Sequence, residues 1–191
     1  MSASYFSQPA IFLIDSLFSL YILAVILRFL LQWVGADFYN PISQFLVKIT
    51  HPPLKIMRRV VPSIGKIDTS SILLAFILQI ISNFCVFLLQ GFLPSIPVLI
   101  IISFSGLLSL IFDVFIFSIF ILALLSWFNP GNYNALHDLL VKLTGPILDN
   151  CRKFIPDLGG MDISPLVALI GLQMIKMMIL PPLQELANLI A

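Results

Sequence analysis

The strongest constraint on this chain is a stretch of sequence that occurs twice. LVKITHPPLKIMRRVVPSIGKIDTS, residues 46–70, returns as LVKLTGPILDNCRKFIPDLGGMDIS at residues 140–164, and the offset of 94 positions needs no gap. The match extends downstream to Gln79 and Gln173. A gapless repeat of this length predicts one structural unit used twice. Identical pairs within the two stretches include Leu46/Leu140, Lys48/Lys142, Thr50/Thr144, Pro52/Pro146, Arg58/Arg152, Gly65/Gly159, Asp68/Asp162 and Ser70/Ser164.

The composition places this repeated unit in a membrane. Of the 191 residues, 60% are hydrophobic and 10% are charged, whereas a soluble domain carries about 25% charged residues. Ten Lys and Arg balance nine Asp and Glu, which argues against nucleic acid as a partner. The sequence also lacks a Walker loop, a dinucleotide fingerprint, a nucleophile elbow and an HExxH motif. We therefore expect an integral membrane protein with no enzymatic activity and no cofactor.

Four apolar runs are long enough to cross a bilayer, for which about 20 helical residues suffice. They predict an all-α fold of four transmembrane helices in two tandem parallel repeats, each consisting of a span, an amphipathic segment and a second span. The first repeat covers residues 1–92, the second covers 105–191, and residues 93–104 form a connecting turn with an extra apolar segment. The expected spans are 11–34, 71–92, 105–128 and 163–180, the last ended by Pro181 and Pro182 and followed by a short tail.

Each repeat carries an amphipathic segment between its spans, at residues 40–66 and 134–160. Asn40 stands before a proline, as an N-cap does before the first helical residue. Pro52 and Pro146 predict that each segment consists of two short helices. Segments with basic and apolar faces of this kind lie along a membrane surface.

Shortly after each segment, a helix is expected to leave its first amides unpaired. The residues there are Asp68 and Ser70 in the first copy and Asp162 and Ser164 in the second. We therefore expect them to cap the spans that follow.

The basic residues are concentrated on one face. Four spans place both amphipathic segments on the same side of the membrane, and the positive-inside rule makes that side cytoplasmic, with both termini outside. Because an even number of spans separates equivalent points, the two repeats are expected to be parallel and related by a pseudo-twofold axis along the membrane normal. Eight of the ten Lys and Arg lie in these segments: Lys48, Lys55, Arg58, Arg59, Lys66, Lys142, Arg152 and Lys153.

These segments offer the first candidate site. Basic side chains beside a bilayer attract anionic lipid headgroups with about 1 kcal/mol each, although the same charges can serve only to set the topology. Both interpretations remain open, and a protein partner is the other candidate for this surface. The candidate residues for lipid or partner binding are Lys55, Arg58, Arg59, Lys66, Arg152 and Lys153.

Polar residues within the spans form the second candidate set, because a charge at the bilayer centre is unfavourable and is usually paired. Asp113 and Lys176 fall at comparable depth, and we predict an ion pair between the third and fourth spans. That pair either fixes helix register or serves transport or proton relay. Arg28 is expected to extend to the cytoplasmic interface rather than to bind a ligand.

A channel or carrier for an ion or small osmolyte is the alternative function. It would use a polar path between the repeats and would require a homo-oligomer, since four helices leave little room for a pore. A metal site is not expected, because His51 and His137 have no Cys, Asp or Glu at ligand spacing. The path would combine Asp113 and Lys176 with Gln79, Asn83 and Gln173.

The repeated motif resembles the YggT family of small bacterial integral membrane proteins, which is related to the YlmG proteins of Gram-positive bacteria and plastids. The resemblance covers nearly the whole chain and implies a non-enzymatic protein of the bacterial inner membrane, associated with osmotic or other membrane stress, division or the assembly of membrane complexes. The second copy departs from the motif at Asn132, Ala135 and Lys153. The first copy carries it at Trp33, Asp37, Phe38, Tyr39, Asn40, Pro41, Thr50, Pro52, Arg58, Arg59, Pro62, Gly65, Asp68 and Ser70.

Overall fold

The computed structural model of the protein describes residues 3–62, 67–128, 134–154 and 162–190. These residues form an all-α fold, as the sequence predicts. The helices are α1 (Ala3–Trp33), α2 (Pro41–Val60), α3 (Thr69–Leu89), α4 (Ile96–Phe128), α5 (Ala135–Phe154) and α6 (Ser164–Ile190).

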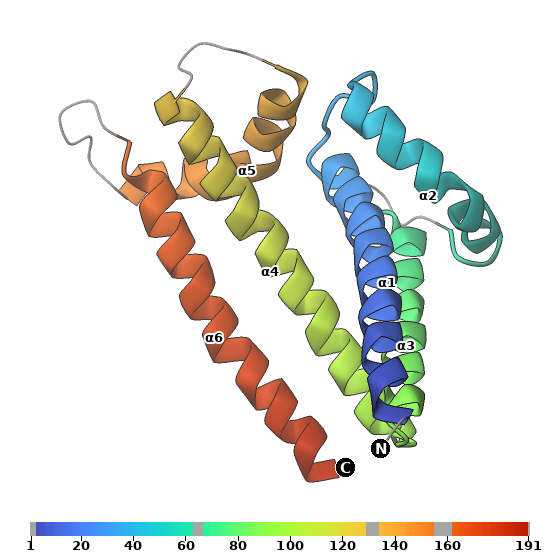
Figure 1. Ribbon diagram of the computed structural model, residues 1–191. Coiled ribbons are helices and arrows are strands. Elements are labelled where there is room, and N and C mark those ends of the chain that lie inside the picture. Colours follow the sequence, from blue (N-terminus) through green and yellow to red (C-terminus); the bar gives the residue numbers. More distant parts are fainter. Residues whose placement is uncertain (1–2, 63–66, 129–133, 155–161, 191) are drawn as a thin grey trace.

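Four of these helices, α1, α3, α4 and α6, are long and apolar enough to cross a membrane. Figure 1 shows them running along a common direction, with α2 and α5 at one end of the bundle and both chain termini at the other. The order span, surface helix, span is therefore present twice, and the two repeats point the same way. The predicted fold class of four spans in two tandem parallel repeats is confirmed.

Three spans are longer than the sequence suggests, since α1 already begins at Ala3. The extra apolar segment at residues 98–104 belongs to α4, which begins at Ile96, and α6 continues through Pro181 and Pro182 to Ile190. A proline fits a helical φ, but it removes the hydrogen bond to the carbonyl one turn earlier and its ring clashes with that carbonyl, so α6 needs other contacts to continue. Ala187, beyond the prolines, is buried, so packing keeps the last turns helical.

The surface segments also differ from the prediction, since each is one helix rather than two. Pro52 and Pro53 lie inside α2, and Pro146 lies inside α5, whose ribbon changes direction along its length in Figure 1. A proline bends a helix without necessarily stopping it when the residues on both sides are held by packing. Leu54 and Leu148, each two residues after the first proline of its segment, are fully or almost fully buried against the spans.

The core lies beneath these surface helices. Leu54 of α2 joins a cluster of buried residues from α1, α3, α4 and α5, and another cluster holds Leu148 of α5 against Ile119 of α4 and Ala168 of α6. Each surface helix is thus seated on the two spans of its own repeat. The buried members of the first cluster are Ile22, Val25, Ile26, Leu30, Leu54, Leu74, Ala75, Leu107, Val114 and Leu143.

The two repeats do not close into a twofold arrangement. Within each repeat the two spans pack on one another, α1 on α3 and α4 on α6, and the repeats are joined mainly by α3 against α4. A closed pseudo-twofold axis would require the equivalent contact between α6 and α1, and the described parts of these helices make none. The parallel orientation is confirmed, but the expected pseudo-twofold relation is not, because α6 lies at an open edge (Figure 1).

Candidate functional site

An ion pair ties α2 to the span that follows it. Nη2 of Arg58, near the end of α2, donates a hydrogen bond to Oδ2 of Asp68, directly before α3. The Asp68 side chain is 1% exposed and the Arg58 side chain 39%. Ser71 Oγ donates to the same carboxylate oxygen over 2.9 Å, and Ser70 Oγ donates to the Val61 carbonyl over 2.5 Å. We call the Arg58–Asp68 pair the first clamp.

The second repeat builds the equivalent pair, which we call the second clamp. Arg152 donates to Asp162 Oδ2 from Nη2 over 2.8 Å and from Nε over 3.1 Å, and its Nη1 donates to Asp149 over 3.2 Å. Its side chains are more open, at 52% for Arg152 and 44% for Asp162. Both arginines were predicted to bind lipid or partners, but each is engaged within the protein. Their first contribution is to hold a surface helix against a span.

The helix caps agree only in part with the prediction. Asp162 Oδ1 accepts a hydrogen bond from the backbone N–H of Ser164 over 2.9 Å, as a capping side chain does. Asp68 occupies the N-cap position of α3, but its side chain caps no backbone N–H. Its Oδ2 accepts from Arg58 and Ser71, and its buried Oδ1 has no hydrogen-bond partner in the described residues. Burial of this carboxylate is therefore offset by side-chain donors.

The clamps perturb the pKa values of their members. Burial opposes ionisation of Asp68, but hydrogen bonds from Arg58 and Ser71 outweigh it and leave the pKa of Asp68 below its usual value. Burial also opposes ionisation of Asp162, but hydrogen bonds from Arg152 and Ser164 outweigh it and lower the pKa of Asp162. The hydrogen bond to Asp162 raises the pKa of Arg152. Both clamps are therefore charged pairs at neutral pH.

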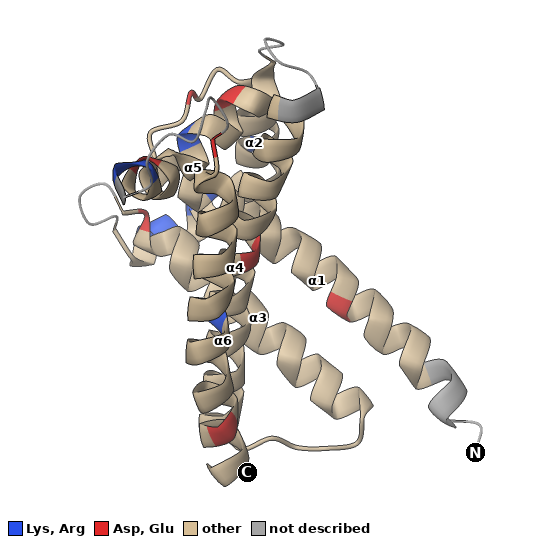
Figure 2. Ribbon diagram, turned by 90° about the vertical axis from the view of Figure 1, so that its left-hand side faces the viewer, with Lys and Arg blue, Asp and Glu red and all other residues tan. Residues whose placement is uncertain are grey.

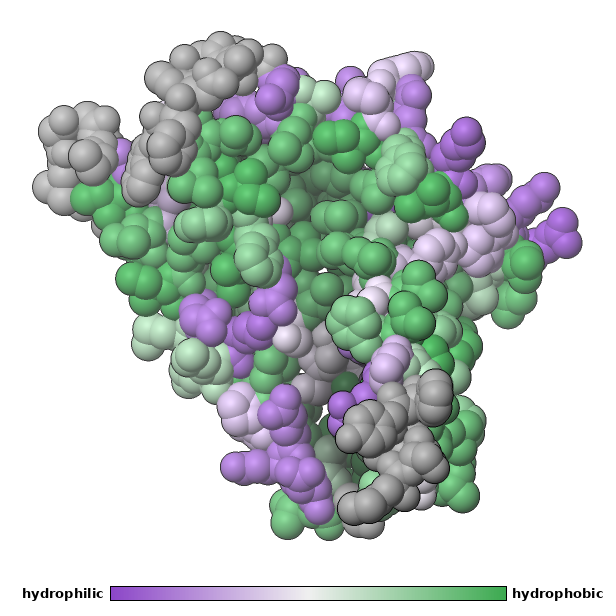
Figure 3. All heavy atoms as spheres, in the orientation of Figure 1, coloured by the Kyte–Doolittle hydropathy of each residue, from purple (hydrophilic) through white to green (hydrophobic). Residues whose placement is uncertain are grey.

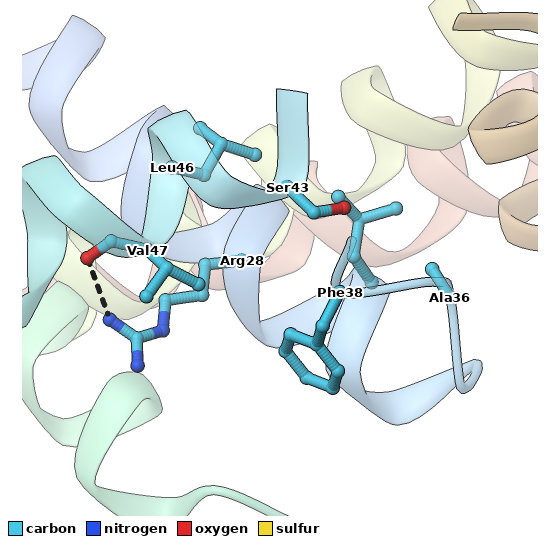
Figure 4. Close-up of a pocket in the computed structure, with 7 residues that line it drawn as sticks. Arg28, Ala36, Phe38, Ser43, Leu46 and Val47 are labelled. Carbon is cyan, nitrogen blue, oxygen red and sulfur yellow. Dashed lines mark hydrogen bonds between the residues drawn. The ribbon is translucent and has the colours of Figure 1, made fainter. Parts of the chain in front are cut away.

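Arg28 lies beneath α2 instead of reaching the headgroups, so the expectation for this residue is wrong. Its Nη1 donates to Thr50 Oγ1 over 2.8 Å and to the Val47 carbonyl over 3.4 Å, as Figure 4 shows in part. Its Nε and Ser43 Oγ have no hydrogen-bond partner in the described part of the chain. Both residues line a cavity of about 10 Å³, which has room for about one water molecule. α2 therefore lies where the Arg28 side chain would otherwise extend toward the headgroups.

The proline inside α2 is matched by a donor from α1. Pro53 has no N–H for the Ile49 carbonyl, and the Tyr21 hydroxyl donates to that carbonyl over 3.2 Å. The second repeat carries Phe115 and Leu122 where the first has Tyr21 and Arg28. In the first repeat, Tyr21 and Arg28 of α1 therefore bind α2 through polar contacts, whereas the second repeat has apolar residues at the two equivalent positions.

The predicted ion pair within the spans is confirmed. Lys176 Nζ of α6 donates to Asp113 Oδ1 of α4 over 2.5 Å, and Ser109 Oγ donates to Asp113 Oδ2 over 3.3 Å. The first repeat has Ser19 and Ser82 at these two positions. The pair therefore joins the two spans of the second repeat.

The other polar residues of the spans do not converge with this pair. Gln79 of α3 packs against Gly106 of α4, and Asn83 Nδ2 donates to Ser103 Oγ of α4 over 3.0 Å. Gln173 is exposed on α6. Gln79 and Asn83 thus lie at the interface of α3 with α4, whereas the Asp113–Lys176 pair lies between α4 and α6.

The remaining basic side chains point outward at the end of the bundle where α2 and α5 lie, the end at which Figure 2 shows Lys and Arg gathered. Asn40 connects these two helices: its Oδ1 accepts from the Ile42 N–H over 2.9 Å, and its Nδ2 donates to the Ala135 carbonyl over 2.7 Å. The predicted N-cap is confirmed. Lys66 lies outside the described residues. We call the exposed cations Lys48, Lys55, Arg59, Lys142 and Lys153 the basic surface.

These features define a four-span membrane protein built from two parallel repeats, each with a surface helix clamped to its second span. A family model described as CCB3/YggT matches residues 7–89 and again residues 101–183. The chain belongs to the CCB3/YggT family. Its two matches are offset by the same 94 positions as the internal repeat.

Relatives of known sequence cover nearly the whole chain. An uncharacterised protein of Pseudomonas aeruginosa is 40% identical over 91% of this chain and 89% of its own length. The uncharacterised protein YggT of Escherichia coli is 37% identical over 94% of this chain and 93% of its own length. An uncharacterised protein of Vibrio alginolyticus is 42% identical over 85% and 88%. No solved structure matches the chain.

The first clamp should contribute more stability than the second, because its carboxylate is buried. We expect Asp68→Asn to destabilise the protein by about 1–3 kcal/mol and Asp162→Asn by at most about 1 kcal/mol, as for an exposed pair. Chemical unfolding in mild detergent measures both.

The effect of Asp68→Asn should also depend on pH. Because the folded pKa of Asp68 is lowered, its stabilisation is complete above the unfolded pKa of about 3.9 and is lost as pH falls through the folded value. The two proteins should therefore differ at pH 7 and converge only in acid. If Asp68→Asn and Asp162→Asn lost the same amount of unfolding free energy at pH 7, the ranking of the first clamp above the second would be contradicted.

The Asp113–Lys176 pair allows a test designed from the repeat. Lys176→Ser leaves a carboxylate in the span without its cation and should destabilise the protein by about 3–5 kcal/mol. Adding Asp113→Ser recreates the pair of serines found in the first repeat and should recover most of that loss. If the double variant is less stable than the single one, the pair has no structural role of this kind.

Proposed function

We propose that this is a non-enzymatic protein of the bacterial cytoplasmic membrane whose basic surface binds anionic lipid headgroups at the inner leaflet. The observation that carries the proposal is the position of α2 and α5. Both lie at the same end of the bundle, each is clamped to a span, and the exposed cations of the basic surface lie on them. Cations beside an anionic leaflet contribute about 1 kcal/mol each to lipid binding.

The cytoplasmic orientation rests on charge. The ends of the spans opposite α2 and α5 carry no Lys or Arg in the sequence, and the positive-inside rule assigns the basic end to the cytoplasm. The termini would then lie outside. Arg58 and Arg152 hold the surface in place, and the exposed cations around them make the lipid contacts.

We infer from the resemblance to the YggT family that this surface acts in membrane stress response, division or the assembly of membrane complexes. A rigid basic surface on the inner leaflet suits such a role, because it gathers anionic lipid and presents apolar side chains beside it. Phe45 and Ile56 are exposed on α2 and offer such side chains. Membrane-protein partners would dock on the same surface.

The alternative, a channel or carrier, has less support. Gln79 and Asn83 lie between α3 and α4, whereas Asp113 is bound to Lys176 between α4 and α6, so these side chains fall into two separate groups. Flux of potassium or a small osmolyte through liposomes containing the purified protein would favour that function over the one proposed.

Lipid selectivity tests the proposal. The protein is extracted in polymer-bounded membrane discs from vesicles of phosphatidylglycerol and phosphatidylcholine, and the lipid composition of the discs is measured. We expect the wild type to enrich phosphatidylglycerol. Replacing Lys55, Arg59 and Lys153 by Gln should reduce its affinity for that lipid by about fivefold per charge, since each is worth about 1 kcal/mol.

The matched control keeps the charge and changes the side chain. Lys55→Arg, Arg59→Lys and Lys153→Arg together should retain the enrichment, and high salt should weaken it in the wild type and the control. Equal enrichment by the neutral variant and the wild type would refute lipid binding by this surface.

A further inference from the structure

Gln173 places an amide on the lipid-facing side of α6. It lies nine residues after Ser164, the first residue of α6, which corresponds to about 14 Å along a helix, close to the middle of a hydrocarbon core about 30 Å thick. The side chain is exposed, and it donates to and accepts from no group in the described residues. Figure 3 shows hydrophilic atoms within the otherwise hydrophobic surface midway along α6.

The first repeat shows what this helix face does when it is covered. Residues 72, 76, 79 and 83 follow one another at spacings of four, three and four along α3. Gln79 and Asn83 in this row meet Gly106 and Ser103 of α4. The part of this row that carries Gln79 and Asn83 therefore joins the two repeats, while Ile72 at its start is exposed.

The equivalent row on α6 has no cover. A shift of 94 positions places it at Leu166, Ile170, Gln173 and Met177, which we call the α6 seam. All four side chains are exposed, and among the described residues α6 packs only on α4 and α5. The spacing of four, three and four is that of the seam of a left-handed helix pair, in which one polar residue fixes the register.

Lipid is a poor occupant for this seam. Hydrocarbon offers an amide no hydrogen bond, and an unsatisfied polar group there is unfavourable by several kcal/mol. Helices within membranes accordingly use Gln side chains to bond to one another. The occupant must therefore supply a polar group at the depth of Gln173.

A second copy of the chain supplies that group through its own α6. In a dimer whose twofold axis is parallel to the membrane normal, equivalent residues lie at equal depth, so Gln173 meets the partner's Gln173. An amide is both a donor and an acceptor, and two facing amides satisfy each other. The α1 helix of a second copy fits less well, because Pro9 and Phe12 stand where α4 has Ser103 and Gly106.

We propose that the protein forms a parallel homodimer through the α6 seam, held by reciprocal hydrogen bonds between Gln173 and the partner's Gln173. Twofold pairing is the commonest symmetry of protein assemblies. The proposal goes beyond lipid binding at the basic surface and does not depend on it. The open edge that α6 leaves in the monomer becomes the dimer interface.

Cysteine crosslinking in native membranes tests the contact. In a full-length chain with Cys85→Ser and Cys151→Ser, we expect Ile170→Cys and Met177→Cys to form disulfide-linked dimers on mild oxidation. Met178→Cys is the matched control, since Met178 is also exposed on α6 but lies off the seam, and it should remain monomeric. Crosslinking at position 178 equal to that at position 177, or crosslinking of Ile170→Cys to Phe12→Cys in α1 instead of to itself, would overturn the proposed pairing.

Dimerisation in lipid tests the role of the amide. Subunit counting by single-molecule photobleaching in vesicles of decreasing protein density gives the dimerisation constant. We expect Gln173→Leu to weaken it roughly tenfold, as loss of interhelical hydrogen bonds does, and Gln173→Asn to weaken it less. An unchanged constant for Gln173→Leu, or a wild type that is monomeric at every density, would refute the proposal. Because residue 173 is exposed, circular dichroism and thermal unfolding should show both variants folded.

Discussion

The structure depends on fastening the shorter helices α2 and α5 to the long apolar helices at one end of the bundle. The Arg58–Asp68 pair does this in the first repeat and the Arg152–Asp162 pair does it in the second. An amphipathic helix without such a bond is held only by its apolar face. With the ion pair, the helix is also held at one position along its span, and neighbouring cations such as Arg59 can be exposed because they are not needed to hold the helix in place.

The same rule governs the polar residues inside the spans, because each needs a partner that water cannot supply. Arg28 finds it in Thr50 and Val47 of α2, and Lys176 finds it in Asp113. The repeats use different solutions. The first fastens its surface helix to α1 with polar contacts, and the second bonds its two spans to each other. Gln173 has no such partner in the described residues, and we propose that a second copy of the chain supplies one.

Much of this architecture could be predicted from the sequence, because the apolar runs give the order of the spans, the gapless repeat relates the two halves, and counting from the span ends gives the depth of each residue. The pairing of Asp113 with Lys176 followed from depth alone. The predictions that were wrong depend on tertiary contacts. Burial of Leu54 and Leu148 keeps their helices continuous across the prolines, and α2 covers Arg28 so that its side chain does not extend to the headgroups.

Two further features, the clamps and the open packing of the repeats, were not predicted from the sequence, for different reasons. The clamps had a visible signal, since Arg and Asp recur ten positions apart in both copies. The open packing of the two repeats had none, because a repeated sequence does not specify how its copies meet.

Hydrogen–deuterium exchange in lipid nanodiscs tests the central claim, that the clamp holds the surface helix in place. We predict that Arg58→Gln raises amide exchange throughout α2 and at the start of α3, while α5, with its own clamp, exchanges as in the wild type. Arg59→Gln, next to it but exposed, should leave α2 protected. Unchanged exchange of α2 in Arg58→Gln, or an equal rise in Arg59→Gln, would contradict the account.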